Sequence, residues 1–140
     1  MRHIMFFNTG DIKEDIDDCL DTLENNHKDF VEWNALGLLF KNRYDNYSDK
    51  TTFEAETDLK KFIECFTMAL KFKLNYKEAW YNLVGSFEEN NDYETAIERY
   101  NMALDIKFNS LKLSRMLFSK LGDVCKKQEK YDKKNKKVLN

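Results

Sequence analysis

Apolar residues recur along this chain with the spacing of three and four residues that an α-helix produces. Between residues 77 and 110 they form two such stripes, separated by a polar stretch at residues 89–92. The stripes contain Ala79, Trp80, Leu83, Val84 and Phe87, and then Tyr93, Ala96, Ile97, Tyr100, Ala103 and Leu104. The pattern predicts two amphipathic helices. The absence of Pro and of any run with strict apolar and polar alternation favours an all-helical chain.

Short polar residues mark where helices should begin and end. Asp92 is placed to cap the second helix of this stretch, and Asn109 lies where that helix should stop. Asp11-x-x-Glu14 and Thr51-x-x-Glu54 resemble capping boxes, which predict helix starts at both places.

The two stripes repeat elsewhere in the chain. The second recurs 34 residues earlier, at positions that include Phe62, Phe66, Ala69 and Leu70, and the first recurs 47 residues earlier, at Trp33, Leu36, Gly37 and Phe40. The 13 additional residues, around 41–58, should lengthen one or both helices and leave an exposed link near Tyr44 to Lys50. A third copy should follow the spacer Leu111 to Ser114, with Phe118, Leu121, Gly122 and Cys125, and end within its second helix.

These residues resemble the tetratricopeptide repeat, W-x2-L-G-x2-Y followed by A-x3-F on a 34-residue unit. Residues 77–110 match best through Trp80, Leu83, Phe87, Tyr93, Ala96, Tyr100 and Ala103, whereas Val84 replaces the usual Gly. The resemblance implies one all-α domain, a right-handed superhelix of antiparallel helix pairs with about two full and two partial repeats. Its parts would be a half repeat at 10–29, an enlarged repeat at 30–76, the best repeat at 77–110 and a truncated repeat at 115–140.

The family also implies a concave groove, lined by the first helix of each pair, that binds a peptide or a helix of another protein. The side chains opposite the core stripe should contact that partner. The expected partner-binding residues are Asn34, Leu38, Lys41, Tyr81, Asn82, Glu88, Lys120 and Lys127. The expected function is therefore that of a non-enzymatic interaction module or scaffold.

Charge keeps two alternatives open. Residues 111–140 carry a net charge of +7 and residues 1–110 carry −9. A self-assembling structural subunit could stack through these opposite ends, and a weak homodimer could also cover the apolar residues Ile4 to Phe7. The basic end could instead bind RNA or an acidic protein. Nucleic acid is the less favoured partner, because no base-reading module is visible.

Residues that carry catalytic or metal chemistry are sparse. His3 and His27 are far apart and lack ligands at metal-binding spacing, and Cys19 and Cys125 fall on core stripes. We therefore expect no catalytic residue, no metal site, no cofactor and no enzymatic activity. Three Cys, an odd number, favour a reducing compartment, here the cytoplasm. No apolar run approaches the length that spans a bilayer.

Overall fold

A computed structural model describes residues 10–88, 92–106 and 108–139, the last three of these by their backbone only. Within those ranges the chain forms six α-helices and no strand, which confirms the all-α prediction. The helices are α1 (Ile12–Asn25), α2 (Phe30–Asn46), α3 (Phe53–Phe72), α4 (Lys77–Glu88), α5 (Tyr93–Asp105) and α6 (Leu111–Leu139). None of these helices combines the length and the apolar character that a membrane crossing would need.

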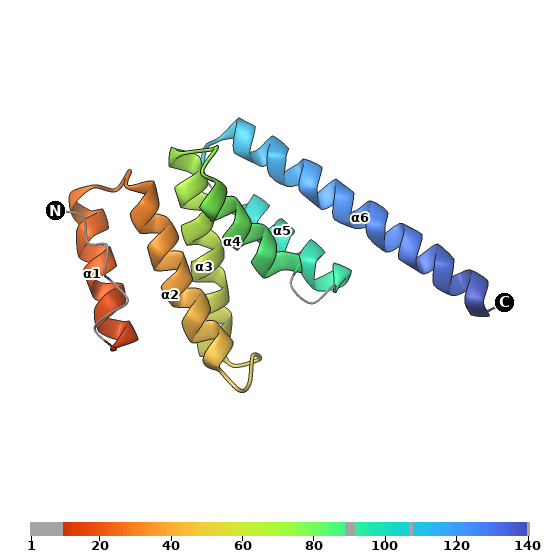
Figure 1. Cartoon of the computed structure of the whole chain (residues 1–140), viewed down its shortest axis with the longest axis horizontal. Helices are drawn as coiled ribbons and strands as arrows, with labels where there is room; N and C mark the ends of the chain where they lie inside the picture. Colours follow the sequence, from red (N-terminus) through yellow and green to blue (C-terminus); the bar gives the residue numbers. More distant parts are fainter. Residues whose placement is uncertain (1–9, 89–91, 107, 140) are drawn as a thin grey trace. The chain divides into compact units, whose positions relative to one another are not determined.

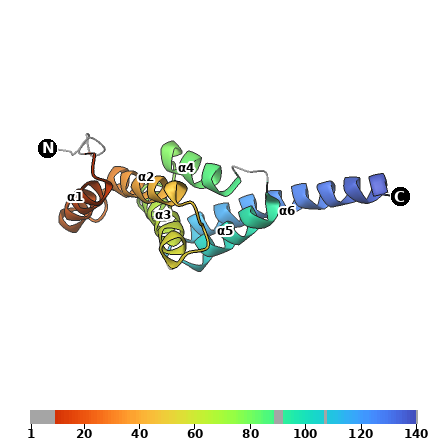
Figure 2. The ribbon, with the colours of Figure 1, turned by 90° about the horizontal axis from the view of Figure 1, so that it is seen from below.

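The chain divides into two compact units, Met1–Leu83 and Val84–Asn140, with the boundary inside α4. In the first unit α2 packs against both α1 and α3, and the three helices lie side by side (Figures 1 and 2). In the second unit α5 packs along α6. The core of each unit is described separately below.

The first unit has a dense aromatic and aliphatic core between α2 and α3. Phe62 and Phe66 on α3 are completely buried, and the ring of Phe62 meets that of Tyr44 on α2 edge to face at 5.6 Å. A Cβ atom added to Gly37 would lie 2.5 Å from the Phe66 ring. Gly37 therefore lets α2 approach α3 more closely than any larger residue would.

The expected lengthening of this helix pair is present. α2 continues to Asn46 and α3 begins at Phe53, so the link is shorter than expected and residues 48–51 within it are exposed. Tyr44 belongs to α2 and is buried. The predicted Thr51 capping box is wrong by one residue, because the Thr52 hydroxyl accepts from the Ala55 amide at 3.2 Å. Asp11, in contrast, caps α1 as predicted.

A partly buried ion pair joins α2 and α3 near the link at residues 47–52. The Arg43 guanidinium donates to both carboxylate oxygens of Asp58, at 2.8 and 2.9 Å, and the Tyr47 hydroxyl donates to the same carboxylate at 3.0 Å. Burial of Asp58 opposes its ionisation, but these hydrogen bonds outweigh that cost and hold the pKa of Asp58 below its ordinary value.

The loops that precede α2 and α4 repeat the same hydrogen bonds 47 residues apart. The Trp33 indole donates to the His27 carbonyl at 2.7 Å, and the Trp80 indole donates to the Leu74 carbonyl at 2.6 Å. This geometry leaves both indoles only partly buried. Trp80, on the predicted core stripe, is buried in part, with its indole N–H at a loop carbonyl, whereas Leu83 of the same stripe is fully buried.

In the second unit, Tyr100 and Ala103 on α5 are fully buried as predicted. The Asp92 carboxylate caps α5 by accepting from the Thr95 amide, also as predicted. The helix ends at Asp105, four residues before Asn109. Asn109 does adopt a positive φ of 55°, but it does so in the connection to α6 rather than at the end of α5.

The predicted third helix pair is not formed. Residues Leu111–Leu139 are one continuous helix, so the spacer 111–114 is helical and the truncated repeat 115–140 has no turn. The stretch 125–131 contains good helix formers and no Gly, Asn or Asp that would favour a break. Leu113, Leu117 and Val124 are buried. Cys125, expected in a core, is exposed. The apolar residues Ile4 to Phe7 lie outside the described residues.

Candidate functional site

The first unit contains a hollow of about 330 Å³ between α2 and the first part of α4. We call it the α2–α4 groove. Its lining residues are Asn34, Leu38, Lys77, Glu78, Tyr81 and Asn82. Four of the eight expected partner-binding residues, Asn34, Leu38, Tyr81 and Asn82, thus come together at one place.

Helix geometry explains why these residues share a face. On α2, Asn34 and Leu38 are one turn apart, while their neighbours Ala35, Leu36 and Leu39 are buried. On α4 the spacing from 77 and 78 to 81 and 82 is also one turn, and the buried Ala79 and Leu83 point elsewhere. The sequence analysis missed Lys77 and Glu78, although their spacing from Tyr81 places them on the same face.

One hydrogen bond joins the two sides of the groove. The Asn82 amide nitrogen donates to the Asn34 side-chain oxygen at 2.9 Å. Asn34 lines the groove as predicted but is only 6% exposed, so little of its side chain is open to a partner. It is buried because it pairs with Asn82, which lies 48 residues away in sequence. Asn34 orients Asn82, whose own oxygen can still accept a hydrogen bond.

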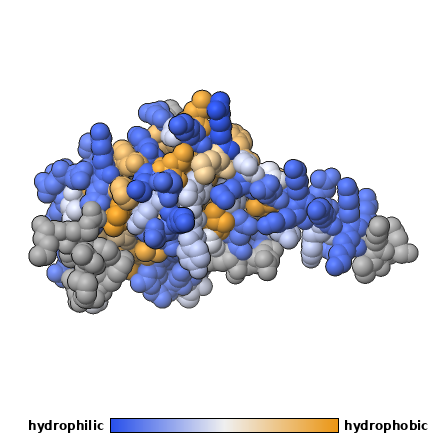
Figure 3. Space-filling model, turned by 45° about the horizontal axis from the view of Figure 1, so that its top comes forward, coloured by the Kyte–Doolittle hydropathy of each residue, from blue (hydrophilic) through white to orange (hydrophobic). Residues whose placement is uncertain are grey.

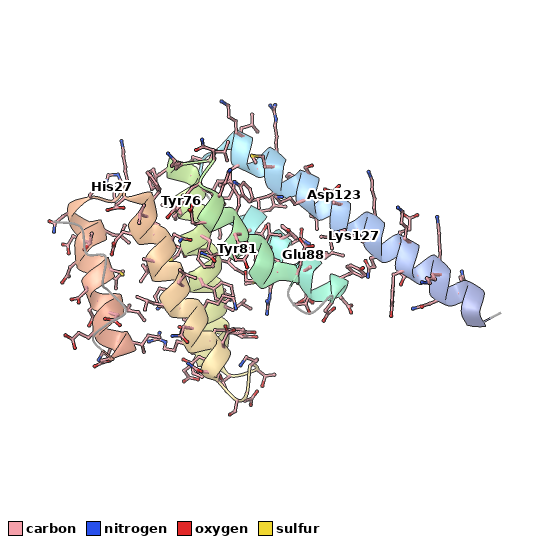
Figure 4. All side chains as sticks on the ribbon, viewed as in Figure 1. His27, Tyr76, Tyr81, Glu88, Asp123 and Lys127 are labelled. Carbon is pink, nitrogen blue, oxygen red and sulfur yellow. The ribbon has the colours of Figure 1, made fainter. Side chains whose placement is uncertain are left out.

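The Tyr81 side chain is the most accessible apolar surface of the groove. It is 80% exposed and projects from α4 (Figure 4). Leu38 is half-buried beside it, and Lys77 and Glu78 are exposed. The groove therefore combines an aromatic ring, an aliphatic side chain, an amide and charges of both signs.

The other expected residues lie elsewhere. Lys41 lies about one helical turn after Leu38 on α2, and its ammonium group forms an ion pair with Asp45 at 2.9 Å. In the second unit Lys127 on α6 lies 3.8 Å from the Glu88 carboxylate at the end of α4 (Figure 4). Lys120 is half-buried on α6. Lys41 does not line the α2–α4 groove, and Lys120 and Lys127 belong to the second unit.

Glu88 has a second partner in the core of its unit. Its carboxylate accepts from the Tyr100 hydroxyl at 2.8 Å. Burial, together with this carboxylate, raises the pKa of Tyr100. Glu88 and Lys127 also line a small hollow of about 70 Å³ with Asp92, Tyr93 and Ala96. Glu88 therefore connects α4 with α5 through Tyr100 and lies close to Lys127 on α6.

The thiols differ in their chemistry. Burial, aided by Glu32, raises the pKa of Cys19, and burial raises the pKa of Cys65. Neither thiol is suited to act as a nucleophile at neutral pH. Cys125 is exposed. Within the described residues, no three His, Cys, Asp or Glu side chains are grouped so that they could bind a metal ion.

Comparison with known proteins adds no family to this description. No protein-family model matches the chain, and no curated protein has a significantly similar sequence. The function is therefore argued from the geometry of the groove.

Proposed function

We propose that this protein is a non-enzymatic interaction module whose α2–α4 groove binds a segment of another protein. The observation that carries the proposal is the exposure of Tyr81, 80% accessible, beside a hollow with an oriented Asn82. Tyr is enriched among the residues that dominate binding energy at protein interfaces.

The groove chemistry suits a peptide segment better than a small reactive substrate. The Tyr81 ring and Leu38 offer apolar contact, and the Asn82 amide can bond a peptide backbone. Lys77 and Glu78 at the same groove can pair with charges of either sign on the segment. These are groups that bind and orient a chain.

The proposal extends to architecture and location. The matching loops before α2 and α4 support stacked helix pairs of the tetratricopeptide type, with a superhelical arrangement. The free thiols of Cys19, Cys65 and Cys125 support a reducing compartment such as the cytoplasm. A scaffold role follows from the same groove, since such modules act by holding partners.

A peptide library displayed on phage tests the groove. Peptides selected on the wild-type protein should bind the Tyr81→Ala variant about 30-fold more weakly, which corresponds to the loss of about 2 kcal/mol at a dominant contact. Asn82→Ala should also weaken binding, by about tenfold, because it removes a backbone-bonding amide. Fluorescence anisotropy of the labelled peptides measures both changes.

Phe53 provides a matched control. It is 79% exposed at the start of α3 and does not line the groove, so Phe53→Ala removes a similar exposed aromatic side chain. This variant should bind the selected peptides as the wild type does. If Tyr81→Ala and Phe53→Ala bind them equally well, with circular dichroism showing both variants folded, the groove assignment is wrong.

A further inference from the structure

The side of α6 opposite its packed face carries an apolar stripe. Leu113, Leu117 and Val124 are buried toward the core of the second unit, where α6 packs on α5. With 3.6 residues per turn, Leu111, Phe118, Gly122 and Cys125 lie on the other side. We call these four residues the outer stripe. Three of its residues, Phe118, Gly122 and Cys125, were predicted together with Leu121 to face a second helix, whereas Leu111 was predicted to lie in the spacer.

The outer stripe is open. Leu111 is 67% exposed and Phe118 is 60% exposed, and Cys125 is also exposed. A Cβ atom added to Gly122 would meet no atom within 4 Å. A partner side chain could therefore come close to the α6 backbone at Gly122, next to the Phe118 ring. Figure 3 shows hydrophilic surface along the far end of α6.

Positive charge lies along one side of the stripe, while Glu129 is in line with it at the far end. Arg115 and Lys126 are exposed on the same side of the helix, and α6 as a whole carries a net charge of +7. Its exposed Lys133 pairs with Glu129 at 3.5 Å, which neutralises part of the far end only. A partner that covers Leu111 and Phe118 would have to place its own polar residues against Arg115 and Lys126, so acidic flanks are favoured.

We propose that the outer stripe of α6 docks an amphipathic helix with acidic flanks from a partner protein. Apolar side chains of that helix cover Leu111 and Phe118, one of them enters the space over Gly122, and its carboxylates pair with Arg115 and Lys126. This surface belongs to the second unit and is separate from the α2–α4 groove, so either proposal can fail without the other.

Charge and burial disfavour two other occupants. A second copy of α6 would bring Arg115 and Lys126 against groups of the same sign. Helix α1 is strongly acidic, but its apolar residues Ile16, Cys19 and Leu23 are buried within the first unit. The one large apolar side chain that α1 exposes is Leu20, at 47%, and a single leucine offers too little apolar surface to cover both Leu111 and Phe118.

The test uses the whole chain and synthetic peptides of about 18 residues, long enough for a stable helix. The acidic probe has Leu at helical spacing and Glu elsewhere, the basic probe has Lys in place of Glu, and a third peptide scrambles the acidic one. Fluorescence anisotropy should show binding of the acidic probe alone, weakened by salt. Phe118→Ser should reduce its affinity by about tenfold or more. Arg115→Glu should also reduce it.

Met116→Ser is the matched control, since Met116 is exposed on α6 but lies outside the outer stripe, and it should leave the affinity unchanged. A second readout is the rate at which iodoacetamide alkylates Cys125, which the acidic probe should slow. The buried thiols of Cys19 and Cys65 have raised pKa values and will react little.

Several results would overturn the proposal. Equal binding of the basic probe would do so, as would an unchanged affinity of the Phe118→Ser variant for the acidic probe. A molecular mass that rises with protein concentration in the wild type, but not in that variant, would assign the stripe to a second copy of the chain. Binding of a 20-nucleotide RNA or of phosphatidylserine vesicles, without binding of the acidic probe, would assign it to nucleic acid or to a lipid surface.

Discussion

Residues around Gly37 in α2 and around Gly122 in α6 have similar apolar spacings but opposite surroundings. At Gly37, α3 comes so close that an added Cβ atom would meet the Phe66 ring at 2.5 Å. At Gly122 the same addition would meet nothing within 4 Å. The indole of Trp33, ahead of Gly37, donates to a loop carbonyl, whereas the ring of Phe118, ahead of Gly122, has no N–H group and is exposed.

This difference shows that apolar spacing specifies a helical face but not what covers it. The α2 stripe becomes core because a polar link at residues 47–52 turns the chain back as α3. The α6 stripe is followed by Lys-rich helix-forming residues, so α6 continues and the stripe remains on the surface. The turn decides whether the same pattern forms a core or stays on the surface.

The largest effect should come from the ion pair that closes the α2–α3 pair. Asp58→Ala leaves the partly buried Arg43 without its carboxylate, and we expect a loss of about 3 kcal/mol in the free energy of unfolding. Urea titration followed by Trp fluorescence measures it. Asp132→Ala, at an exposed acidic residue of α6, should stay within about 0.5 kcal/mol of wild type.

The Arg43–Asp58 ion pair also predicts how the stability of the protein depends on pH. The pKa of Asp58 is lower in the folded than in the unfolded chain, so its contribution is fully present above the unfolded value of about 4. That contribution is lost as the pH falls through the folded pKa. The stability gap between wild type and Asp58→Ala should therefore be constant from pH 7 to about 5 and narrow below about 4. A gap that widens in acid would contradict the assigned ion pair.

The local elements of the fold could be predicted, but the pairing of distant residues could not. Asp11 and Asp92 cap their helices as their spacing indicated, because a cap depends on residues two or three positions away. The burial of Asn34 could not be inferred, since its partner Asn82 is 48 residues distant. Tyr81 and Leu38 were predicted at the groove because the family resemblance assigns it to the first helix of each pair and helix periodicity places both residues opposite the core stripe.

The continuous α6 was missed for a physical reason of its own. The repeat register placed a turn after Cys125, yet the residues there favour helix in every local respect. The repeat register is weak there, and helix propensity outweighs it. The absence of Gly, Asn and Asp between 125 and 131 favours one continuous helix.

Replacing Gly37 and Gly122 by alanine should change the free energy of unfolding in opposite directions. Gly37→Ala forces the Phe66 ring to move, so we expect destabilisation by about 1–3 kcal/mol. Gly122→Ala meets open space inside a helix, so we expect stabilisation by about 0.5–1 kcal/mol. Both Trp residues lie in the first unit, so fluorescence reports Gly37→Ala, and far-UV circular dichroism reports Gly122→Ala. Equal changes at both sites would contradict the contrast between the two helices.

The smallest expected effect concerns the tryptophan bonds to the loop carbonyls. Trp33→Phe and Trp80→Phe each keep an aromatic ring but remove the donor to His27 or Leu74, and each should cost about 1 kcal/mol. Phe118→Trp is the converse change. Lys112, six positions before residue 118, lies inside α6, and its carbonyl accepts a backbone hydrogen bond of the helix. The new indole N–H therefore has no loop carbonyl to bind, and Phe118→Trp should leave the free energy of unfolding unchanged. Urea unfolding followed by circular dichroism compares all three variants. A stabilisation by Phe118→Trp equal to either loss would mean that the start of α6 forms the same loop as the other two, and that the contrast with α2 is wrong.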